Sequence, residues 1–165
     1  MTIAIYPGSF DPITSGHLDI AVRASRLFDK VIIGIYDDPS TKVLLFSTRE
    51  RVKLAKEAVG NNPRIEVVSY KCLTGDFARK VDAHAMVRGL RMGGDFEMEF
   101  TLTMMNRKLF PDIEQLCLMS AVEYQFVSSS LLKEVASLGG NVEGLVPPNV
   151  ARALMAKFGS KSKSI

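Results

Sequence analysis

Apolar residues occur along the chain in short runs separated by longer stretches of mixed character. Five runs rich in Ile, Val and Leu lie at residues 2–6, 30–36, 64–70, 84–89 and 114–120. These runs are apolar without strict alternation, which is typical of parallel strands covered on both faces. The pattern therefore predicts five buried strands.

The stretches between these runs have the spacing of amphipathic helices. In three of them, apolar or small residues recur along one helical face: Leu18, Ala21, Val22 and Ser25; Val52, Leu54, Ala55 and Ala58; Met98, Leu102, Met105 and Leu109. Strand and helix thus alternate, which indicates βαβ units with right-handed crossovers. The predicted fold is a single-domain α/β structure, a Rossmann-like open parallel sheet of five strands with helices on both faces.

Local signals mark several helix ends. Ser47 and Glu50 form a capping box that opens the second helix, and residues 60–63 end it with glycine, two asparagines and proline. Residues 128–140 predict a helix that is capped by hydroxyl groups and stopped by two glycines. The prolines at 147–148 start a last helix.

Length and composition agree with one compact domain. The chain has 165 residues, of which 47% are hydrophobic, and no repeat or linker divides it. We assign residues 1–158 to the domain and residues 159–165 to a polar tail that we expect to be disordered. Cys72 and Cys117 have no metal-ligand spacing and stand beside apolar residues, so we expect two buried free thiols.

Charge and hydropathy exclude several classes of function. The chain has 21 Lys and Arg residues and 18 Asp and Glu residues, so its formal net charge is only +3. A net charge this small does not favour binding to nucleic acid or to a membrane surface. The chain begins without the features of a secretory signal, and no stretch approaches the ~18 apolar residues of a membrane span. We expect a soluble, cytoplasmic protein.

The turn after the first predicted strand is unusually long. Residues 6–17 read YPGSFDPITSGH, far more than a simple strand-to-helix connection needs. In an open parallel sheet, ligands bind beyond the carboxyl ends of the strands, and the N-terminus of the next helix favours an anion such as phosphate. Gly8 and Gly16 would let the backbone approach a ligand. His17 would either stabilise charge on a phosphate oxygen or simply cap the helix.

Two familiar nucleotide sites are excluded by glycine spacing. The turn contains only Gly8 and Gly16, so the G-x-G-x-x-G fingerprint of dinucleotide-binding folds is absent, and no P-loop motif occurs anywhere in the chain. The carboxylates form no obvious metal cage, and we therefore assign no metal ligand.

Three further features have both a binding and a structural interpretation. Arg88 and Arg91 follow the fourth predicted strand and would either neutralise phosphates or lie solvated at the surface. The serines of residues 128–130 would bind an anion at a helix N-terminus or only cap that helix. Lys42 lies in a loop and would bind a phosphate or be exposed to solvent.

Three separated segments resemble one family. Residues 6–17, 87–91 (VRGLR) and 127–136 (VSSSLLKEVA) are similar to phosphopantetheine adenylyltransferase, of the nucleotidyltransferase superfamily marked by a T-x-G-H motif. The likeness extends from residue 2 to about residue 158, in the same order and spacing. The resemblance implies a nucleotidyltransferase fold and transfer of AMP from ATP to 4′-phosphopantetheine, which gives dephospho-coenzyme A and pyrophosphate, the penultimate step of coenzyme A biosynthesis.

The resemblance also implies roles for individual residues. His17 would stabilise the transition state of a direct in-line attack at the α-phosphate. ATP would be contacted by Ser9, Phe10, His17, Gly89, Leu90, Arg91, Glu99, Tyr124, Gln125, Phe126, Val127, Ser128, Ser129 and Ser130. Phosphopantetheine would be contacted by Ser9, Lys42, Thr74 and Arg88. Mg²⁺ would arrive with ATP, coenzyme A would bind as a feedback ligand, and the chain would form a homohexamer.

Two alternatives remain at this point. One is a cytidylyltransferase that acts on a small phosphoalcohol, and the other is a nucleotide-binding module without catalytic activity on the same fold. Around Lys42 the sequence departs from the family, because the loop reads Ser40, Thr41, Lys42 where relatives commonly have S-K-[KR].

Overall fold

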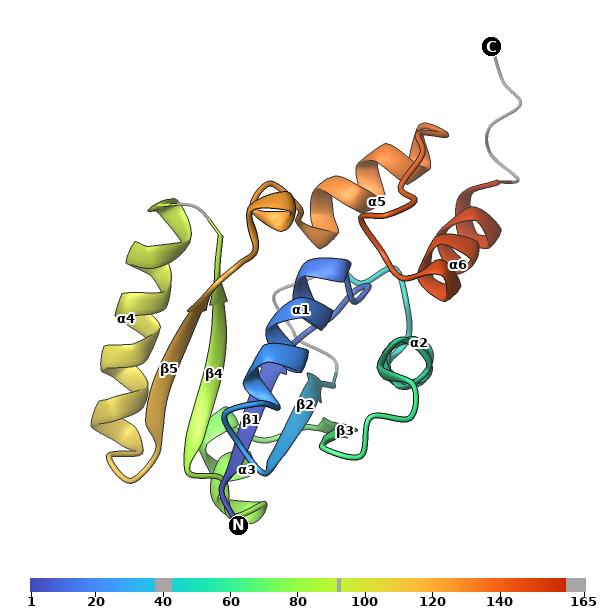
Figure 1. Ribbon diagram of the computed structural model, residues 1–165. Helices are drawn as coiled ribbons and strands as arrows, with labels where there is room; N and C mark the ends of the chain where they lie inside the picture. The colour runs from blue at the N-terminus through green and yellow to red at the C-terminus, as the bar shows by residue number, and fades with distance from the viewer. Residues whose placement is uncertain (38–42, 92, 160–165) are drawn as a thin grey trace.

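The computed structural model describes residues 1–37, 43–91 and 93–159. Its strands are β1 (Ile3–Gly8), β2 (Lys30–Tyr36), β3 (Ile65–Tyr70), β4 (Ala85–Leu90) and β5 (Glu114–Met119). Its helices are α1 (Ser15–Ala24), α2 (Thr48–Val59), α3 (Thr74–Lys80), α4 (Gly93–Leu109), α5 (Ser129–Ser137) and α6 (Pro148–Phe158), with a short 3₁₀ helix η1 (Val122–Tyr124). The predicted alternation of strands and helices is confirmed (Figure 1).

All five strands are parallel and form one open sheet in the order β3-β2-β1-β4-β5. The chain first builds outward from β1 through β2 to β3, then crosses back to place β4 on the other side of β1. The order of the strands therefore reverses between β1 and β4. In sheets of this type, that reversal leaves a crevice beyond the carboxyl ends of the two strands.

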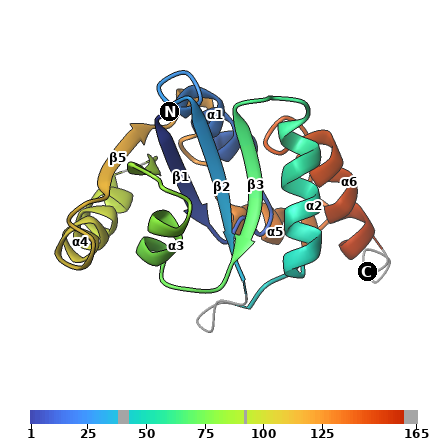
Figure 2. The same cartoon turned by 90° about the horizontal axis from the view of Figure 1, so that it is seen from below.

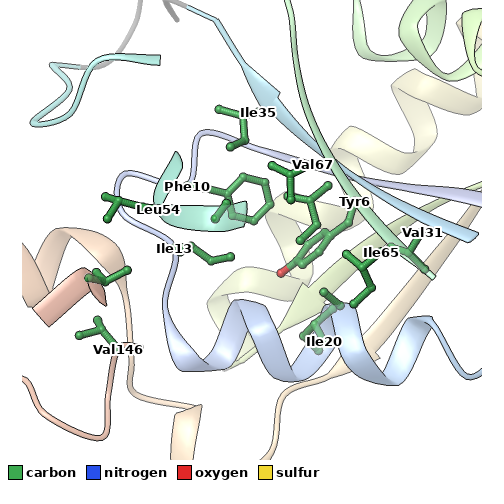
Figure 3. Packing of buried hydrophobic residues seen from close by; sticks show 14 of the residues in the cluster. Tyr6, Phe10, Ile13, Ile20, Val31, Ile35, Leu54, Ile65, Val67 and Val146 are labelled. Carbon is green, nitrogen blue, oxygen red and sulfur yellow. The ribbon is translucent and has the colours of Figure 1, made fainter. Parts of the chain in front are cut away.

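The two faces of the sheet carry separate hydrophobic cores, because successive side chains of a strand point to opposite faces. Ala4 and Tyr6 of β1 join a large core with residues of α1, α2, α5 and α6, part of which is drawn in Figure 3. Ile5 belongs to the other core, with Phe77 of α3 and Phe110. Figure 2 shows α3 and α4 on the opposite side of the sheet from α1. The predicted helices on both faces are present.

Two predictions about burial are wrong at the sheet edges. β5 is an edge strand whose residues are half-buried or exposed, and β3 alternates between buried and exposed positions. Cys117 of β5 and Cys72, in the turn after β3, are both exposed. The physical reason is that an edge strand has only one neighbouring strand and less cover, which its apolar sequence does not reveal.

Several helix ends agree with the sequence signals. The Ser47 hydroxyl accepts from the backbone N–H of Glu50, whose carboxylate accepts from the Ser47 N–H. Gly60 ends α2 with a φ of +63°, a conformation that favours glycine. Pro148 is the first residue of α6, as expected. The predicted tail lies outside the described residues from position 160 onward, and no described helix is long and apolar enough to cross a membrane.

α3 was not predicted from the sequence, and Thr74 is its first residue. The helix has no side-chain cap, so local sequence signals are weak. It is held by tertiary contact, since a Cβ on Gly75 would overlap the ring of Phe110. The absence of a side chain at Gly75 thus allows α3 to pack closely.

In α4, the apolar side chains lie on the exposed face and the polar side chains on the more buried face, the opposite of what the pattern predicts. The predicted apolar stripe of Met98, Leu102, Met105 and Leu109 is 45% to 60% exposed. The more buried positions of the same helix are polar, namely Glu99, Thr103 and Asn106. The helical spacing was correct, but the apolar face points away from the rest of this chain.

Candidate active site

A cavity of about 450 Å³ opens at the reversal of strand order. Its walls come from the turn between β1 and α1, the end of β4 with the start of α4, and the segment from Ser120 to α5. Residues Val43 and Leu44 form part of its rim. Segments far apart in the sequence therefore meet at the carboxyl edge of the sheet (Figure 1).

The cavity exists because β1 and β4 separate. Their paired positions are Ala4 with Ala85 and Ile5 with Met86, whereas β1 continues to pair with β2 as far as Gly8. Beyond this point, the Arg88 side chain spans the gap and donates from Nη1 to the Pro7 carbonyl at 2.9 Å. A cation thus replaces the missing strand pairing and lies in the wall of the cavity.

The long first turn is held in shape by polar contacts from behind. Arg51 of α2, fully buried, donates to the carbonyls of Ser9 and Tyr36 at 2.7 and 2.9 Å. The Asp11 carboxylate accepts from the backbone N–H groups of Leu45 and Phe46, each at 2.9 Å. The turn is therefore tied to the segments that follow β2.

The two glycines of this turn make room for side chains. A Cβ on Gly8 would lie 3.0 Å from the ring of Phe10, which is buried beneath the turn. The interpretation of Gly8 as a point of ligand approach is thus not needed, because Phe10 already fills that space. A Cβ on Gly16 would lie 3.1 Å from Cβ of Tyr124. Gly16 allows η1 to pack against the start of α1, and both residues line the cavity.

His17 serves as a cap and also lines the cavity. Its Nδ1 accepts from the Thr14 backbone N–H at 3.1 Å, and the Thr14 hydroxyl accepts from the His17 N–H. Because Nδ1 is an acceptor, the neutral ring carries its proton on Nε2, which has no hydrogen-bond partner among the described residues. His17 can therefore cap the helix through Nδ1 and still offer its Nε2–H group to a ligand.

Burial, together with the nearby positive charges of Arg91 and Arg88, lowers the pKa of His17 from its ordinary 6.5 to about 4. Protonation would also place a second hydrogen against the Thr14 N–H. His17 is therefore neutral at physiological pH, so it offers a ligand an N–H group rather than a full positive charge.

Both arginines of the R-G-L-R segment are ordered by carboxylates of α4. Arg88 binds Glu99 through Nε and Nη2 at 2.8 and 2.6 Å, and Glu99 is buried. Arg91 binds Asp95 and also donates to the Val127 carbonyl at 2.9 Å. Neither is a freely solvated surface residue, so that alternative is excluded. A guanidinium has more N–H donors than these contacts use, and the rest remain for an anion.

The serine-rich start of α5 combines a cap with further contacts. The Ser128 hydroxyl caps the helix by accepting from the Leu131 N–H, and Ser129 donates to the Pro12 carbonyl at 2.8 Å. Ser130 is exposed and lines the cavity. Of the three serines, only Ser128 caps α5. The N-termini of α1 and α5 both border the cavity, which favours the binding of an anion there.

Most of the predicted site residues line this cavity: Ser9, Phe10, His17, Arg88, Gly89, Arg91, Glu99, Tyr124, Val127, Ser128, Ser129 and Ser130. Four do not, namely Leu90, Thr74, Gln125 and Phe126. Leu90 is buried, Phe126 is 58% exposed, and the Thr74 hydroxyl contacts that of Tyr70. Lys42 lies outside the described residues.

Among the residues that line the cavity, sequence reasoning missed four with ionisable side chains: Tyr6, Asp11, Asp95 and Lys133. The Lys133 ammonium lies 2.7 Å from Asp11 Oδ2, although the two are far apart in the chain. One signal was available, because Lys133 follows Ser129 by four positions and so lies on the same face of α5. The partner of Lys133 required the tertiary structure.

The described residues contain no group of three His, Cys, Asp or Glu side chains that could hold a metal ion. Two carboxylates of the cavity, Asp95 and Glu99, are engaged by arginines. Their arrangement suits fixed cations that bind anionic groups, rather than a metal held by the protein alone.

Comparison with known proteins agrees with this arrangement. The profile of the family described as Cytidylyltransferase-like matches residues 5–135. Phosphopantetheine adenylyltransferase from Roseiflexus sp. (strain RS-1) is 53% identical over 161 residues, which cover 98% of this chain and all of that protein. The enzyme of the same name from Moorella thermoacetica is 50% identical over 159 residues, 96% of this chain and 99% of its own length.

A solved structure shares the fold at low identity. It is the crystal structure of a candidate nicotinate-nucleotide adenylyltransferase from Vibrio parahaemolyticus, with a TM-score of 0.68 and 15% identity, covering 99% of this chain and 98% of that one.

The state of His17 is tested by nitrogen-detected NMR of the imidazole. We expect a neutral ring with its proton on Nε2 throughout the range from pH 8 to pH 5, because the pKa lies near 4. His84→Gln removes the second of the two histidines and assigns the signal. The unfolded chain takes up this proton below about 6.5, so His17 lowers stability as the pH falls from 6.5 towards 4. Titration of the His17 ring with a midpoint near 6.5 would contradict this account.

Proposed function

The chain belongs to the phosphopantetheine adenylyltransferase family, within the cytidylyltransferase-like proteins, and from this membership we propose that it transfers AMP from ATP to the 4′-phosphate of phosphopantetheine. The protein is a nucleotidyltransferase enzyme. The observation that carries the proposal is one cavity that joins His17, Arg88, Arg91 and the N-terminus of α5. The products are dephospho-coenzyme A and pyrophosphate, in a step of coenzyme A biosynthesis.

The proposed reaction needs no covalent enzyme intermediate. An oxygen of the 4′-phosphate attacks the α-phosphorus of ATP and forms the new P–O bond. The bond from the α-phosphorus to the bridging oxygen breaks, and its electron pair leaves with pyrophosphate. The protein's task is to hold both phosphates in line and to stabilise the charge of the transition state.

His17 is proposed to act through Nε2–H. The group donates to an α-phosphate oxygen as negative charge accumulates there, and its contact with Thr14 keeps the ring in one orientation. A neutral donor is sufficient for this task, because the reaction requires no proton transfer from the ring. The low pKa of His17 therefore supports a role as a hydrogen-bond donor rather than as an acid.

Arg88 and Arg91 are proposed to bind phosphates with the N–H groups that Glu99 and Asp95 leave free. The ion pairs hold each guanidinium in place before substrate arrives. Arg88, between the ends of β1 and β4, is assigned to phosphopantetheine, and Arg91, beside Val127, to ATP. Ser9, Lys42 and Thr74 complete the family's set for phosphopantetheine, although Thr74 does not line the cavity.

For ATP we retain the family's set of contacts, with two changes of emphasis. Phe10 is buried in the wall of the cavity, and we propose that it shapes the nucleotide site. Leu90, Gln125 and Phe126 do not line the cavity, and we propose that they position their neighbours instead. Mg²⁺ is treated as part of the substrate MgATP, held by phosphate oxygens and water, as this cation usually is.

We also propose that coenzyme A, which carries the same adenylyl and pantetheine portions as the product, binds in this cavity as a feedback ligand. Since ATP is a substrate, the expected location of the reaction is the cytoplasm. The proposed feedback binding rests on the family and on the cavity that most of the predicted contacts line. The expected location rests on the family.

The nucleotide preference is tested by measuring pyrophosphate released from phosphopantetheine and Mg²⁺ with either ATP or CTP. We expect release with ATP and little with CTP. Product with CTP alone would indicate the cytidylyltransferase alternative. Binding of ATP without release of pyrophosphate would indicate the module that lacks catalytic activity.

The role of His17 is tested by its replacement with alanine. His17→Ala should lower kcat by about 10²–10³, the usual effect of removing one donor to a developing oxyanion, with little change in KM. Thr14→Val, which removes the cap hydroxyl and keeps His17, separates capping from catalysis through a thermal unfolding measurement. A His17→Ala enzyme with normal kcat would reduce His17 to a cap.

We propose in addition that the exposed face of α4 is covered by further copies of the chain in a homohexamer. Phe96, Phe100 and Met104 are 53% to 58% exposed on the same helix as the stripe described above. So much apolar surface on one helix is unusual for a monomer and typical of an interface. The half-exposed edge strand β5 lies beside it.

The assembly is tested by sedimentation velocity at micromolar concentration. The wild-type chain should sediment as a hexamer rather than as the 18.2 kDa monomer. Phe100→Glu should reduce the size of the assembly because it places a charge in the apolar face. Leu138→Glu, at an apolar position that is 82% exposed outside α4, is the matched control and should not. A stable wild-type monomer would contradict the proposal.

A further inference from the structure

Phe10 has a backbone conformation that residues with a side chain seldom adopt. Its φ is +46°, in the left-handed region that favours glycine. Such a conformation persists only where the surrounding structure holds it, and it is most common at functional sites. The side chain is 3% exposed and lines the cavity from within the long first turn. The contacts of its ring should therefore show why the turn keeps this conformation.

The ring of Phe10 packs against two other rings. Its centroid lies 5.3 Å from that of Tyr6, with an angle of 87° between the ring planes, and 5.1 Å from that of His17, with an angle of 75°. Both are edge-to-face arrangements, a preferred geometry for aromatic pairs. Figure 3 shows the rings of Phe10 and Tyr6 next to each other in the large core. Aromatic contacts thus connect β1 to the first turn of α1 through Phe10.

The contact with Phe10 supplies a restraint that the hydrogen bond to His17 does not. The Thr14 N–H holds one atom of the imidazole, Nδ1, at 3.1 Å. This bond alone would let the imidazole tilt about that atom. A closely packed ring at a steep angle limits the tilt, because the tilted imidazole would meet it. One fixed atom and one fixed plane together determine where Nε2–H points.

The Phe10 ring also covers part of the imidazole. His17 is neutral mainly because it is buried, and Phe10 is one of its buried neighbours. The charged groups that act on the imidazole are Arg88 at the end of β4 and Arg91 directly after it, and both favour the neutral form. Tyr6 of β1 is uncharged, since burial raises its pKa above its ordinary value of 10. The aromatic cover thus helps to keep His17 in the state that donates from Nε2.

We propose that Phe10 is a positioning residue whose ring sets the plane of the His17 imidazole and thereby aims Nε2–H at the α-phosphate. The inference rests on the proposed adenylyl transfer. It assigns to the Phe10 side chain a role exerted through His17 and not through the nucleotide. Filling the core requires neither an aromatic ring nor a left-handed backbone, whereas this contact uses both. Gly8 leaves the space for it, because a Cβ there would lie 3.0 Å from the Phe10 ring.

The kinetic test is a double-mutant cycle between Phe10→Leu and His17→Ala. Phe10→Leu should lower kcat by about tenfold, because the donor remains but is misdirected, and should change the KM values for ATP and phosphopantetheine by less than about twofold. In the His17→Ala background, Phe10→Leu should cause no further fall in kcat, since the group through which it acts is gone. Losses that add in the double variant would overturn the proposal.

Nitrogen-detected NMR of the imidazole tests the contact in the free enzyme. In Phe10→Leu, the pKa of His17 should rise from about 4 towards 6.5, because the smaller side chain admits water to one side of the ring. The carbon-bound protons of His17 should also lose the shift caused by the neighbouring aromatic ring. Imidazole signals and a titration identical to those of wild type would show that Phe10 does not restrain His17.

The matched control is Ile35→Val. Ile35 is fully buried in the same core as Phe10 but belongs to β2. Its truncation should lower thermal stability and leave both kcat and the His17 signals unchanged. An equal fall of kcat in Ile35→Val would overturn the proposal, because any loosened core would then have the same effect. If Phe10→Leu does not fold, Phe10→Met is measured instead against the same criteria.

The wild-type enzyme separates this inference from the proposed function. If the wild-type chain releases no pyrophosphate from ATP and phosphopantetheine, the proposed function fails, and the NMR measurement still decides whether Phe10 restrains His17. If the wild-type chain is active and Phe10→Leu keeps its kcat, only the role of Phe10 fails.

Discussion

The separation of β1 from β4 is the constraint on which the candidate site depends. The two strands must pair near their beginnings to join the halves of the sheet, and they must part near their ends to leave room for two substrates. The bond from Arg88 to the Pro7 carbonyl meets both needs, because it connects the strands without closing the gap. Glu99 then balances the charge and fixes the guanidinium. An arginine that supports the sheet is thereby also presented to a phosphate.

Buried polar side chains organise the segments around this gap. Arg51 joins the turn after β1 to the end of β2 and the start of α2, and Asp11 joins the same turn to residues 45–46 and to Lys133 of α5. Burying such groups is costly unless hydrogen bonds satisfy them, so their positions are specific. The long first turn is consequently held in one shape, with His17 fixed by its bond to the Thr14 N–H.

α4 illustrates how far local pattern can mislead. Its apolar residues have helical spacing, yet Glu99, Thr103 and Asn106 are the positions that face the rest of the chain, and the apolar stripe is exposed. Spacing reports which residues share a face, and not what covers that face. The same holds for the cysteines, since a thiol next to apolar residues is buried only if another element lies over it. β5 has no such cover on its outer side.

The sequence by itself determined the order of the five strands and of the main helices other than α3, the capping box at Ser47, and the turn that carries Ser9 and His17. Hydrophobic period, caps and turns depend on residues close in the chain. The resemblance of three motifs added further residues that line the cavity, among them Gly89, Glu99 and Tyr124. Only the tertiary structure decided that Asp11 meets Lys133, that Arg88 bridges β1 and β4, and that His17 is held neutral. These features arise from groups distant in sequence, whose burial and charge become defined only when the sheet brings them together.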